Sequence, residues 1–254
     1  MINLVRLTEE GLIKWLRSRL EKREYMNGYY FSESELWEQI YDIIFYELKT
    51  GLEEIERYFI PFGQAGYLSA KRKLELMLFI LEKDYGNCFY FLQEVSGQTV
   101  ITENVIEQIY RNWALEGRLL LSDEEKREFF VRILADQMGL GVLAVLQRIA
   151  ADGIFLGELC PSAGQVQCRG QAAVRNQGEL LWLPVLSIED QAELIRIIKM
   201  IIAGENRGEL TAMEPFWECV REDGSCITAI RPPAGKDWGI RILYGASGKE
   251  QKEW

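Results

Sequence analysis

Residues 216–231, FWECVREDGSCITAIR, contain the clearest signal for tertiary structure in the sequence. This stretch contains two runs rich in β-branched, aromatic and other apolar residues, Phe216–Arg221 and Cys226–Arg231, with Asp223-Gly224 between them. Asp-Gly between two such runs is a strong β-hairpin signal. We therefore predict two antiparallel strands joined by a tight turn.

The register of this hairpin has consequences for its side chains. If Asp-Gly alone forms the turn, Arg221 lies directly across from Cys226, with both side chains on one face. Cys219 and Cys226 then lie diagonally, about 7–8 Å apart, which is beyond comfortable disulfide reach. Pro232-Pro233 must end the second strand, because proline has no amide hydrogen to donate.

The sequence around the hairpin predicts the rest of a sheet. Short apolar runs indicate strands at Gly153–Leu156, Gln165–Arg169, Ala172–Arg175, Leu180–Leu183 and Trp238–Tyr244. Asn176-Gln177-Gly178 is typical of a hairpin turn, and Ser187 is a candidate cap for a strongly apolar helix over residues 188–203. Strands, helix, hairpin and strand in this order predict an α+β layer, a mainly antiparallel sheet with a helix packed across it.

The first half of the chain has helical patterns. Helices are predicted at residues 8–22, 33–49, 50–59, 69–86, 102–117, 122–138 and 142–149, with capping boxes at Ser32/Glu35, Thr50/Glu53 and Ser122/Glu125. The aromatic segment Cys88–Val95 is compatible with either a strand or a helix. We therefore divide the chain into a helical region at 1–121, an α+β domain at 122–246 and a polar tail at 247–254.

The amino-acid composition excludes several classes of binding and catalytic site. The 254 residues are 48% apolar and 27% charged, as in a folded globular protein. The net charge of −10 argues against a dedicated nucleic-acid binder, whose affinity comes largely from neutralising phosphates. The sequence contains no histidine, which excludes Ser-His-Asp and Cys-His catalysis and every zinc site that uses histidine.

Cysteine usage and hydropathy point to a reducing compartment. Five cysteines occur without any Cys-x-x-Cys spacing, so we expect buried free thiols and no metal site. Acidic residues at Glu9 and Glu10 come too early for a signal peptide. The most apolar later runs, 76–81 and 197–203, are far shorter than the ~20 residues that cross a bilayer. We expect a cytoplasmic protein without direct membrane insertion.

Four features occur in a fixed order between Ser122 and Tyr244. They are Gly139-Leu140-Gly141 after a helix, the run Gly153–Leu156, the strand-turn-strand pattern at 174–180 before a serine-capped helix, and finally Asp223-Gly224-Ser225, Pro232-Pro233 and Ile240-Arg241-Ile242. Together they resemble the N-terminal domain of the type II/type IV secretion ATPases, most closely the Flp/Tad pilus motor ATPases. The last feature is the most specific, because its spacing and order both match the family's DGSR, PP and IR pattern.

The chain departs from this family where ATP would be hydrolysed. The family's N-terminal domain leads into a motor domain with a Walker A loop, whose amides hold phosphates and whose lysine reaches the β- and γ-phosphates. The nearest match, residues 245–250, fails at two positions: the glycine required five residues before Gly248 is Leu243, and the serine or threonine required after Lys249 is Glu250. The chain ends at Trp254, so we expect no motor domain and no ATPase activity of its own.

The resemblance also indicates candidate site residues. Cys226 stands where the family usually has an arginine implicated in contacting the motor's nucleotide, and Arg221 would lie near that place if the predicted register holds. The alternative is that Arg221 is an ordinary exposed charge on a sheet. The candidates for contacting a nucleotide or a partner are Arg221, Cys226, Arg231 and Arg241. The structural motif comprises Asp223, Gly224, Pro232 and Pro233.

The resemblance implies a PAS-like domain that acts as a non-catalytic adaptor or regulator of a type II/IV secretion or Flp/Tad pilus apparatus. Its partners would be proteins of that machine, including a motor ATPase, and not nucleic acid. ATP would be bound only through the partner motor, with no other cofactor. The protein would reach the inner face of the membrane only through such partners.

Two other functions fit the sequence. The first is a small-molecule binding module on the same fold, with a pocket lined by Trp182, Trp217, Tyr244 and Cys226. The second is an enzyme that uses paired carboxylates, such as Glu53-Glu54 or Glu222-Asp223. The second is disfavoured, because adjacent residues on a helix do not face each other and Asp223 already has a role in the turn.

Overall fold

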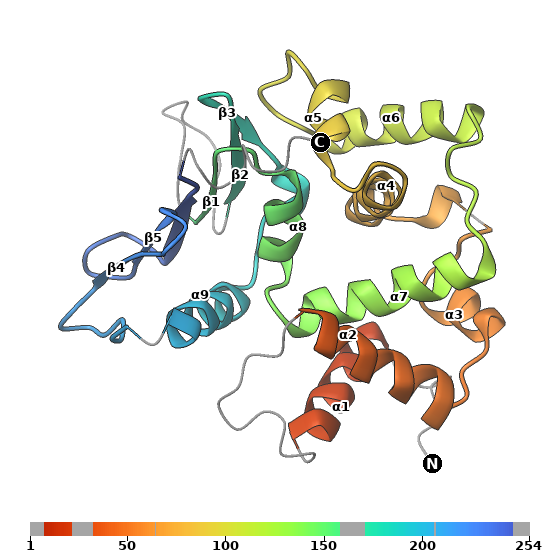
Figure 1. Ribbon diagram of the computed structural model, residues 1–254, viewed down its shortest axis with the longest axis horizontal. Helices are drawn as coiled ribbons and strands as arrows, with labels where there is room; N and C mark the ends of the chain where they lie inside the picture. The colour runs from red at the N-terminus through yellow and green to blue at the C-terminus, as the bar shows by residue number, and fades with distance from the viewer. Residues whose placement is uncertain (1–7, 22–32, 64, 158–170, 206, 246–254) are drawn as a thin grey trace.

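The computed structural model describes residues 8–21, 33–63, 65–157, 171–205 and 207–245. A helical region leads into a six-stranded sheet (Figure 1), which confirms the predicted α+β class. The division of the chain after residue 121 stays a prediction. The predicted strand Gln165–Arg169 lies outside the described residues.

The helices that precede the sheet follow the predicted pattern. They are α1 (Glu9–Glu21), α2 (Glu33–Tyr41), α3 (Leu52–Tyr58), α4 (Ala70–Tyr85), α5 (Phe89–Glu94), α6 (Glu103–Leu115), α7 (Asp123–Met138) and α8 (Val142–Ile149). A π-helical segment, Asp42–Glu47, extends α2, and a 3₁₀ turn, Ala65–Tyr67, precedes α4. Of the two structures compatible with Cys88–Val95, the chain adopts the helix, α5.

Local signals explain where several helices begin and end. Ser122 Oγ accepts the Glu125 amide at 3.3 Å, and the Glu125 carboxylate accepts the Ser122 amide at 2.7 Å, which is the predicted capping box of α7. Ser69 caps α4 by accepting the Arg72 amide at 3.2 Å. Gly86 ends α4 with a φ of 72°, a left-handed conformation that glycine adopts without strain.

The predicted start of α3 is wrong by one residue. Thr50 is buried, and its amide donates to Ile44 (3.1 Å), so Thr50 closes the preceding helical segment instead of opening the next one. Gly51 takes the cap position, and its amide donates to the carboxylate of Glu54 at 3.0 Å. Ser32 of the other predicted capping box lies outside the described residues.

Helix α9 (Gln191–Glu205), which follows β3 and precedes β4 along the chain, begins three residues later than predicted. Ser187 donates its amide to Pro184 (3.0 Å) and so closes a 3₁₀ turn at Pro184–Leu186. Asp190 caps the helix instead, because its carboxylate accepts the amide of Ala192 at 2.9 Å.

Helix α7 lies at the centre of the helices that precede the sheet, where it contacts α1, α2, α3 and α8. Phe129 and Phe130 on α7 are both buried. Phe130 packs against Phe59 with ring centroids 5.3 Å apart, and Phe129 lies 5.4 Å from Phe79 of α4. Packing of this kind between distant segments stabilises the helices more than their intrinsic propensity does.

The sheet is antiparallel throughout. Its strands are β1 (Gly153–Gly157), β2 (Gln171–Asn176), β3 (Glu179–Trp182), β4 (Phe216–Val220), β5 (Cys226–Ile230) and β6 (Gly239–Leu243), in the spatial order β3-β2-β1-β6-β5-β4. Gln177 and Gly178 form the two-residue turn between β2 and β3, as predicted. Both have positive φ, 52° and 82°, as a type I′ turn requires.

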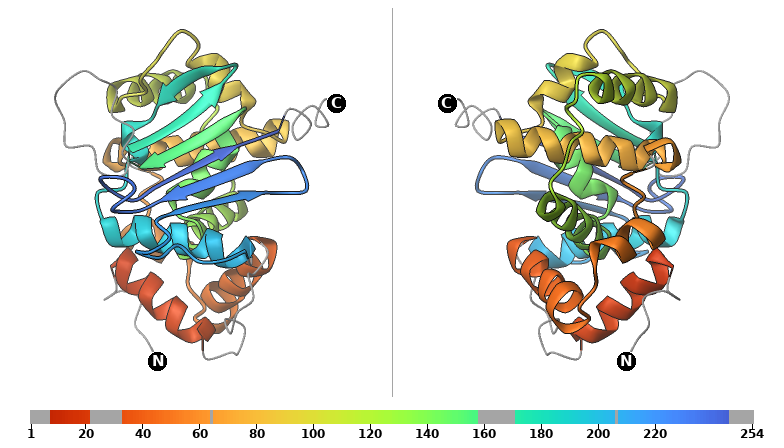
Figure 2. Two further views of the ribbon diagram at one scale, coloured as in Figure 1. Left: turned by 90° about the vertical axis from the view of Figure 1, so that its left-hand side faces the viewer. Right: turned by 90° about the vertical axis from the view of Figure 1, so that its right-hand side faces the viewer.

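Segments from the two halves of the chain meet at the edge of the sheet formed by β3. Trp182 donates its amide to Thr99 at 2.9 Å and accepts the amide of Ile101 at 2.8 Å, so a loop of the helical region pairs with this edge strand. On one face of the sheet, α8 contacts β1 and β2 while α9 contacts β6. Figure 2 shows the sheet in front of the helices in its left-hand view.

Candidate functional site

The two faces of the sheet differ in their side chains. Residues that point toward the helices are buried; they include Ile154, Leu156, Val174, Trp217, Cys219, Ile227, Ile240 and Ile242. The alternate residues form the other face, here called the outer face. No described helix crosses the outer face (Figure 2, left). An antiparallel sheet covered on one side usually keeps such a face for solvent or for a partner.

A row of mixed polar and apolar residues runs through the middle of the outer face, and its members Thr228, Phe155 and Ala173 are buried. Its members lie side by side across the six strands in the order Glu218, Thr228, Arg241, Phe155, Ala173 and Trp182. Arg241 is exposed and donates from Nη2 to Thr228 Oγ1 at 3.5 Å. Phe155 is buried, and the guanidinium of Arg175 lies 5.5 Å from its ring centroid. The centre of the outer face therefore combines an aromatic ring with two arginines.

Apolar side chains lie on the outer face at the β4 edge of the sheet, on both sides of the pair formed by Glu218 and Thr228. Phe216 and Val220 are each 54% exposed. Phe216 is opposite Ile230, and Val220 is opposite Cys226; both partners on β5 are half-buried. Exposed apolar side chains that neighbour one another and border polar ones are typical of a surface that contacts another molecule.

The predicted two-residue turn at Asp223-Gly224 is wrong. The amide of Gly224 donates to Arg221 (3.0 Å), and the amide of Arg221 donates to Ser225 (2.9 Å), so the loop contains one residue more than predicted. Gly224 has a φ of 78°, as expected when a type I turn is followed by a left-handed residue. Asp223 Oδ1 stabilises this loop by accepting both the amide (2.8 Å) and the hydroxyl (2.6 Å) of Ser225. These bonds hold the pKa of Asp223 below its ordinary value.

The added residue changes which side chains share a face. Val220, not Arg221, lies opposite Cys226, while Cys219 lies opposite Ile227. Because side chains alternate along a strand, Cys219 and Cys226 are on opposite faces. The predicted diagonal pair is therefore wrong. Both thiols are free.

Arg221 points away from the outer face. Its guanidinium pairs with Glu205 at the end of α9, with Nε–Oε1 at 2.8 Å and Nη2–Oε1 at 2.5 Å. Cys219, on the helix-facing side, also contacts this carboxylate at 3.7 Å. Arg221 therefore joins the hairpin to α9, and its guanidinium does not lie beside Cys226 on the outer face.

The four candidate residues do not form one site. Cys226 and Arg241 share the outer face on neighbouring strands. Arg221 lies at one end of the β4–β5 hairpin. Arg231 lies at the other end, just before Pro232-Pro233, which do end strand β5 as predicted.

The pocket predicted from Trp182, Trp217, Tyr244 and Cys226 does not form. Trp217 is on the helix-facing side, where its indole Nε1 donates to the carbonyl of Arg207 at 2.6 Å, whereas Cys226 is on the outer face. Tyr244 follows β6, and burial raises the pKa of its hydroxyl to about 12. These residues cannot line a common cavity.

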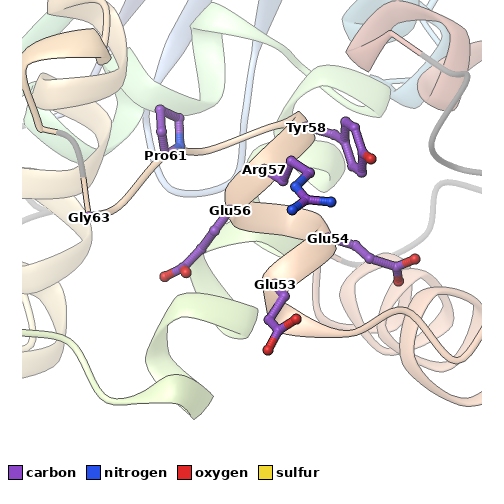
Figure 3. Close-up of a pocket in the computed structure, with 7 residues that line it drawn as sticks. All are labelled: Glu53, Glu54, Glu56, Arg57, Tyr58, Pro61 and Gly63. Atoms are coloured by element: carbon purple, nitrogen blue, oxygen red, sulfur yellow. The ribbon is translucent and has the colours of Figure 1, made fainter.

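One surface hollow, of about 650 Å³, lies beside α3, and its lining includes Glu53 and Glu54, one of the two carboxylate pairs considered from the sequence (Figure 3). Glu54 accepts the amide of Gly51, and Glu56 pairs with Lys126 at 3.0 Å. Figure 3 shows Glu53, Glu54 and Glu56 pointing in different directions. The pair Glu53-Glu54 therefore does not converge on a common substrate atom.

Sequence reasoning missed most of the outer face. The alternation in β4, where Phe216, Glu218 and Val220 are exposed while Trp217 and Cys219 are buried, follows the two-residue period of a half-buried strand and could have identified it. Thr228, Phe155 and Arg175 carry no such signal, because only strand order brings them together.

The described residues contain no group of three or more cysteine, aspartate or glutamate side chains placed to hold a metal ion. No single described helix has both the length and the apolar character needed to cross a bilayer. Among the described helices, α7 and α8 have that length and character only when they are counted together, and they are bent by 113° relative to each other. No family model matches the chain, and no curated protein matches it.

Proposed function

We propose that this protein is a non-catalytic adaptor or regulator that binds a protein component of a type II/IV secretion or Flp/Tad pilus machine. The relation to that machine rests on the ordered sequence motifs that end in Asp223-Gly224-Ser225 and Ile240-Arg241. The sequence contains no Walker A loop, so in this proposal ATP is hydrolysed by the partner.

The outer face of the sheet supports a binding role. Phe216 and Val220 expose more than half of their side chains beside the charged Glu218 and Arg241. Burying apolar surface favours association by roughly 25 cal/mol per Å², and aromatic residues with arginines are enriched at interfaces. The proposed occupant is a folded protein of the machine that covers β4, β5 and β6 and places an acidic side chain against Arg241.

Arg241 gives this surface its specificity. Thr228 provides its one described hydrogen bond, at 3.5 Å, and no described carboxylate forms an ion pair with it. A carboxylate of the partner would therefore gain a charged, two-point contact without displacing an existing pair. The adaptor proposal thus predicts that charge reversal at Arg241 weakens binding more than loss of Phe216 alone.

The test is capture of partners from native cells by the tagged protein, followed by identification by mass spectrometry. We expect the tagged protein of natural sequence to capture a P-loop motor ATPase or a pilus platform protein. The double variant Phe216→Ser/Arg241→Glu should lose it. Leu115→Ser is the matched control, because Leu115 is 88% exposed on α6 and not on the sheet.

Either of two results would contradict the proposal. One is the absence of any secretion or pilus protein among the captured proteins. The other is equal recovery of that protein by the outer-face variant and by Leu115→Ser. Circular dichroism of both variants should match the natural protein, because all three positions are exposed.

A further inference from the structure

A second hollow, of about 760 Å³, lies between the C-terminal half of α9, the segment 208–212 and the end of β5. It is separate from the outer face, because Ile202 and Ala203 of α9 form part of its wall. Arg231 and Lys199 bring two positive charges to it. Hollows that combine apolar walls with a few charged groups are typical of small-ligand sites.

Arg231 is held in place before any ligand arrives. Its carbonyl accepts the amides of Ala234 at 3.0 Å and Gly235 at 3.2 Å. Its guanidinium lies 4.9 Å from the ring centroid of Trp238, which is buried, and its Nε donates to the carbonyl of Pro232 at 3.4 Å. The two terminal nitrogens have no partner in the described part of the chain. A stacked guanidinium with free terminal N–H groups is suited to two-point binding of a carboxylate.

The charges around the hollow favour a single negative charge on the ligand. Lys199 is exposed, and no ion pair joins it or Arg231 to a carboxylate among the residues that the structure describes. Glu209 is the one acidic residue in the wall. Two cations and one carboxylate leave a net charge of +1, which matches a monocarboxylate and disfavours a polyphosphate.

The remaining walls favour an aliphatic body. Ile202, Ala203, Leu210 and Ala212 supply apolar surface around the charged residues. Each methylene group buried against such walls contributes about 0.8 kcal/mol. The affinity of the hollow for a ligand should therefore increase with the length of the ligand's aliphatic chain as well as with its negative charge.

We propose that this hollow binds an aliphatic monocarboxylate, with the carboxylate on Arg231 and Lys199 and the chain against Ile202 and Leu210. This inference does not depend on the adaptor function. The same chemistry could be supplied by a free organic acid or by the terminal carboxylate of a peptide.

The test is titration of the full-length protein with butanoate, hexanoate and octanoate, each compared with the alcohol of equal chain length. The readout is the indole signal of Trp238 in ¹H–¹⁵N spectra, since Arg231 is stacked on that ring. We expect the acids to bind more tightly by about fourfold per added methylene, while the alcohols bind far more weakly. N-acetyl-leucine and its amide test whether the natural ligand is the terminal carboxylate of a peptide. Tighter binding of N-acetyl-leucine than of hexanoate would assign the site to a peptide C-terminus.

Charge-removing variants test the assigned residues. Arg231→Gln should weaken octanoate binding by about tenfold or more, because a charged hydrogen bond is lost. Lys199→Gln changes only an exposed helix position, so it tests the site even if Arg231→Gln perturbs the loop. Lys236→Gln removes the same charge from the neighbouring loop but not from the hollow. The proposal is overturned if no acid binds, if the alcohols bind as well, or if Lys236→Gln weakens binding as much as the other two.

Discussion

Arg148 of α8 and Asp136 of α7 form a two-point ion pair, with Nη1–Oδ2 at 2.8 Å and Nη2–Oδ1 at 2.5 Å. Both side chains are largely buried, 13% and 8% exposed. The pair spans the corner where α7 and α8 meet at 113°, and α8 leads directly into β1. It therefore links the helical region to the first strand of the sheet.

Breaking this pair should be costly. Asp136→Ala leaves the guanidinium of Arg148 buried without its carboxylate, and we expect a loss of about 3 kcal/mol or more in the free energy of unfolding. Urea denaturation followed by circular dichroism measures it. Lys14→Ala is the control, because it breaks an exposed pair with Glu10 and should leave the urea midpoint unchanged. A small effect of Asp136→Ala would mean that the pair contributes little.

Substitution by alanine should destabilise the protein to different extents at Gly224 and Gly157. Gly224 has a φ of 78° with open space around it, so Gly224→Ala should cost only the left-handed strain, about 1 kcal/mol. Gly157 has a φ of 139°, and an added Cβ would lie 2.5 Å from the Cα of Gly239. Gly157→Ala should cost about 2–4 kcal/mol, because strain and overpacking add. Equal melting temperatures for the two variants would contradict the β1–β6 register.

The Asp223 loop should make the hairpin sensitive to acid. Hydrogen bonds from Ser225 lower the pKa of Asp223 in the folded protein. The stabilisation is therefore present above the unfolded-state pKa of ~3.9 and is lost as the pH falls through the folded value. The difference in melting temperature between the natural protein and Asp223→Ala should be constant near neutral pH and shrink below pH ~4. A difference that grows on acidification would exclude this role.

The described cysteines should differ in reactivity. Cys88 is buried, and burial raises the pKa of its thiol to about 12, so it should resist alkylation. Cys219 is buried as well, whereas Cys226 is half-buried on the outer face. Brief treatment of the folded protein with iodoacetamide should label Cys226 before the other two, as read by peptide mass spectrometry. Cys226→Ser should abolish that first label, and preferential labelling of Cys219 would contradict the assigned faces.

Most elements of the fold could be predicted because their signals are local. Ser122 and Glu125 are three residues apart, and Gln177-Gly178 adopts its turn through its own backbone preferences. The failures occurred where a neighbour competed for the same residue. The amide of Thr50 bonds to Ile44 and that of Ser187 to Pro184. Each residue therefore closes the preceding turn, and the capping positions fall later, at Gly51 and Asp190.

The hairpin shows how a small local difference changes a predicted site. Asp-Gly indicated a turn correctly, but the loop contains one more residue, since Asp223 engages Ser225 and Gly224 takes the left-handed position. A shift of one residue moves a side chain to the other face of a sheet. For this reason Arg221 pairs with Glu205 and not with a ligand beside Cys226.

Local signals were enough to predict the α+β class, most of the strands and the β4–β5 hairpin, because hydrophobic period and turn residues act over a few positions. The strand order β3-β2-β1-β6-β5-β4 could not be predicted in this way. In the folded chain it brings Phe155 beside Arg241 and leaves the outer face without a described helix. The tertiary structure also placed Lys199 of α9 and Arg231 of the following hairpin around one hollow. These contacts join residues far apart in the chain, and their energies depend on packing that no local pattern encodes.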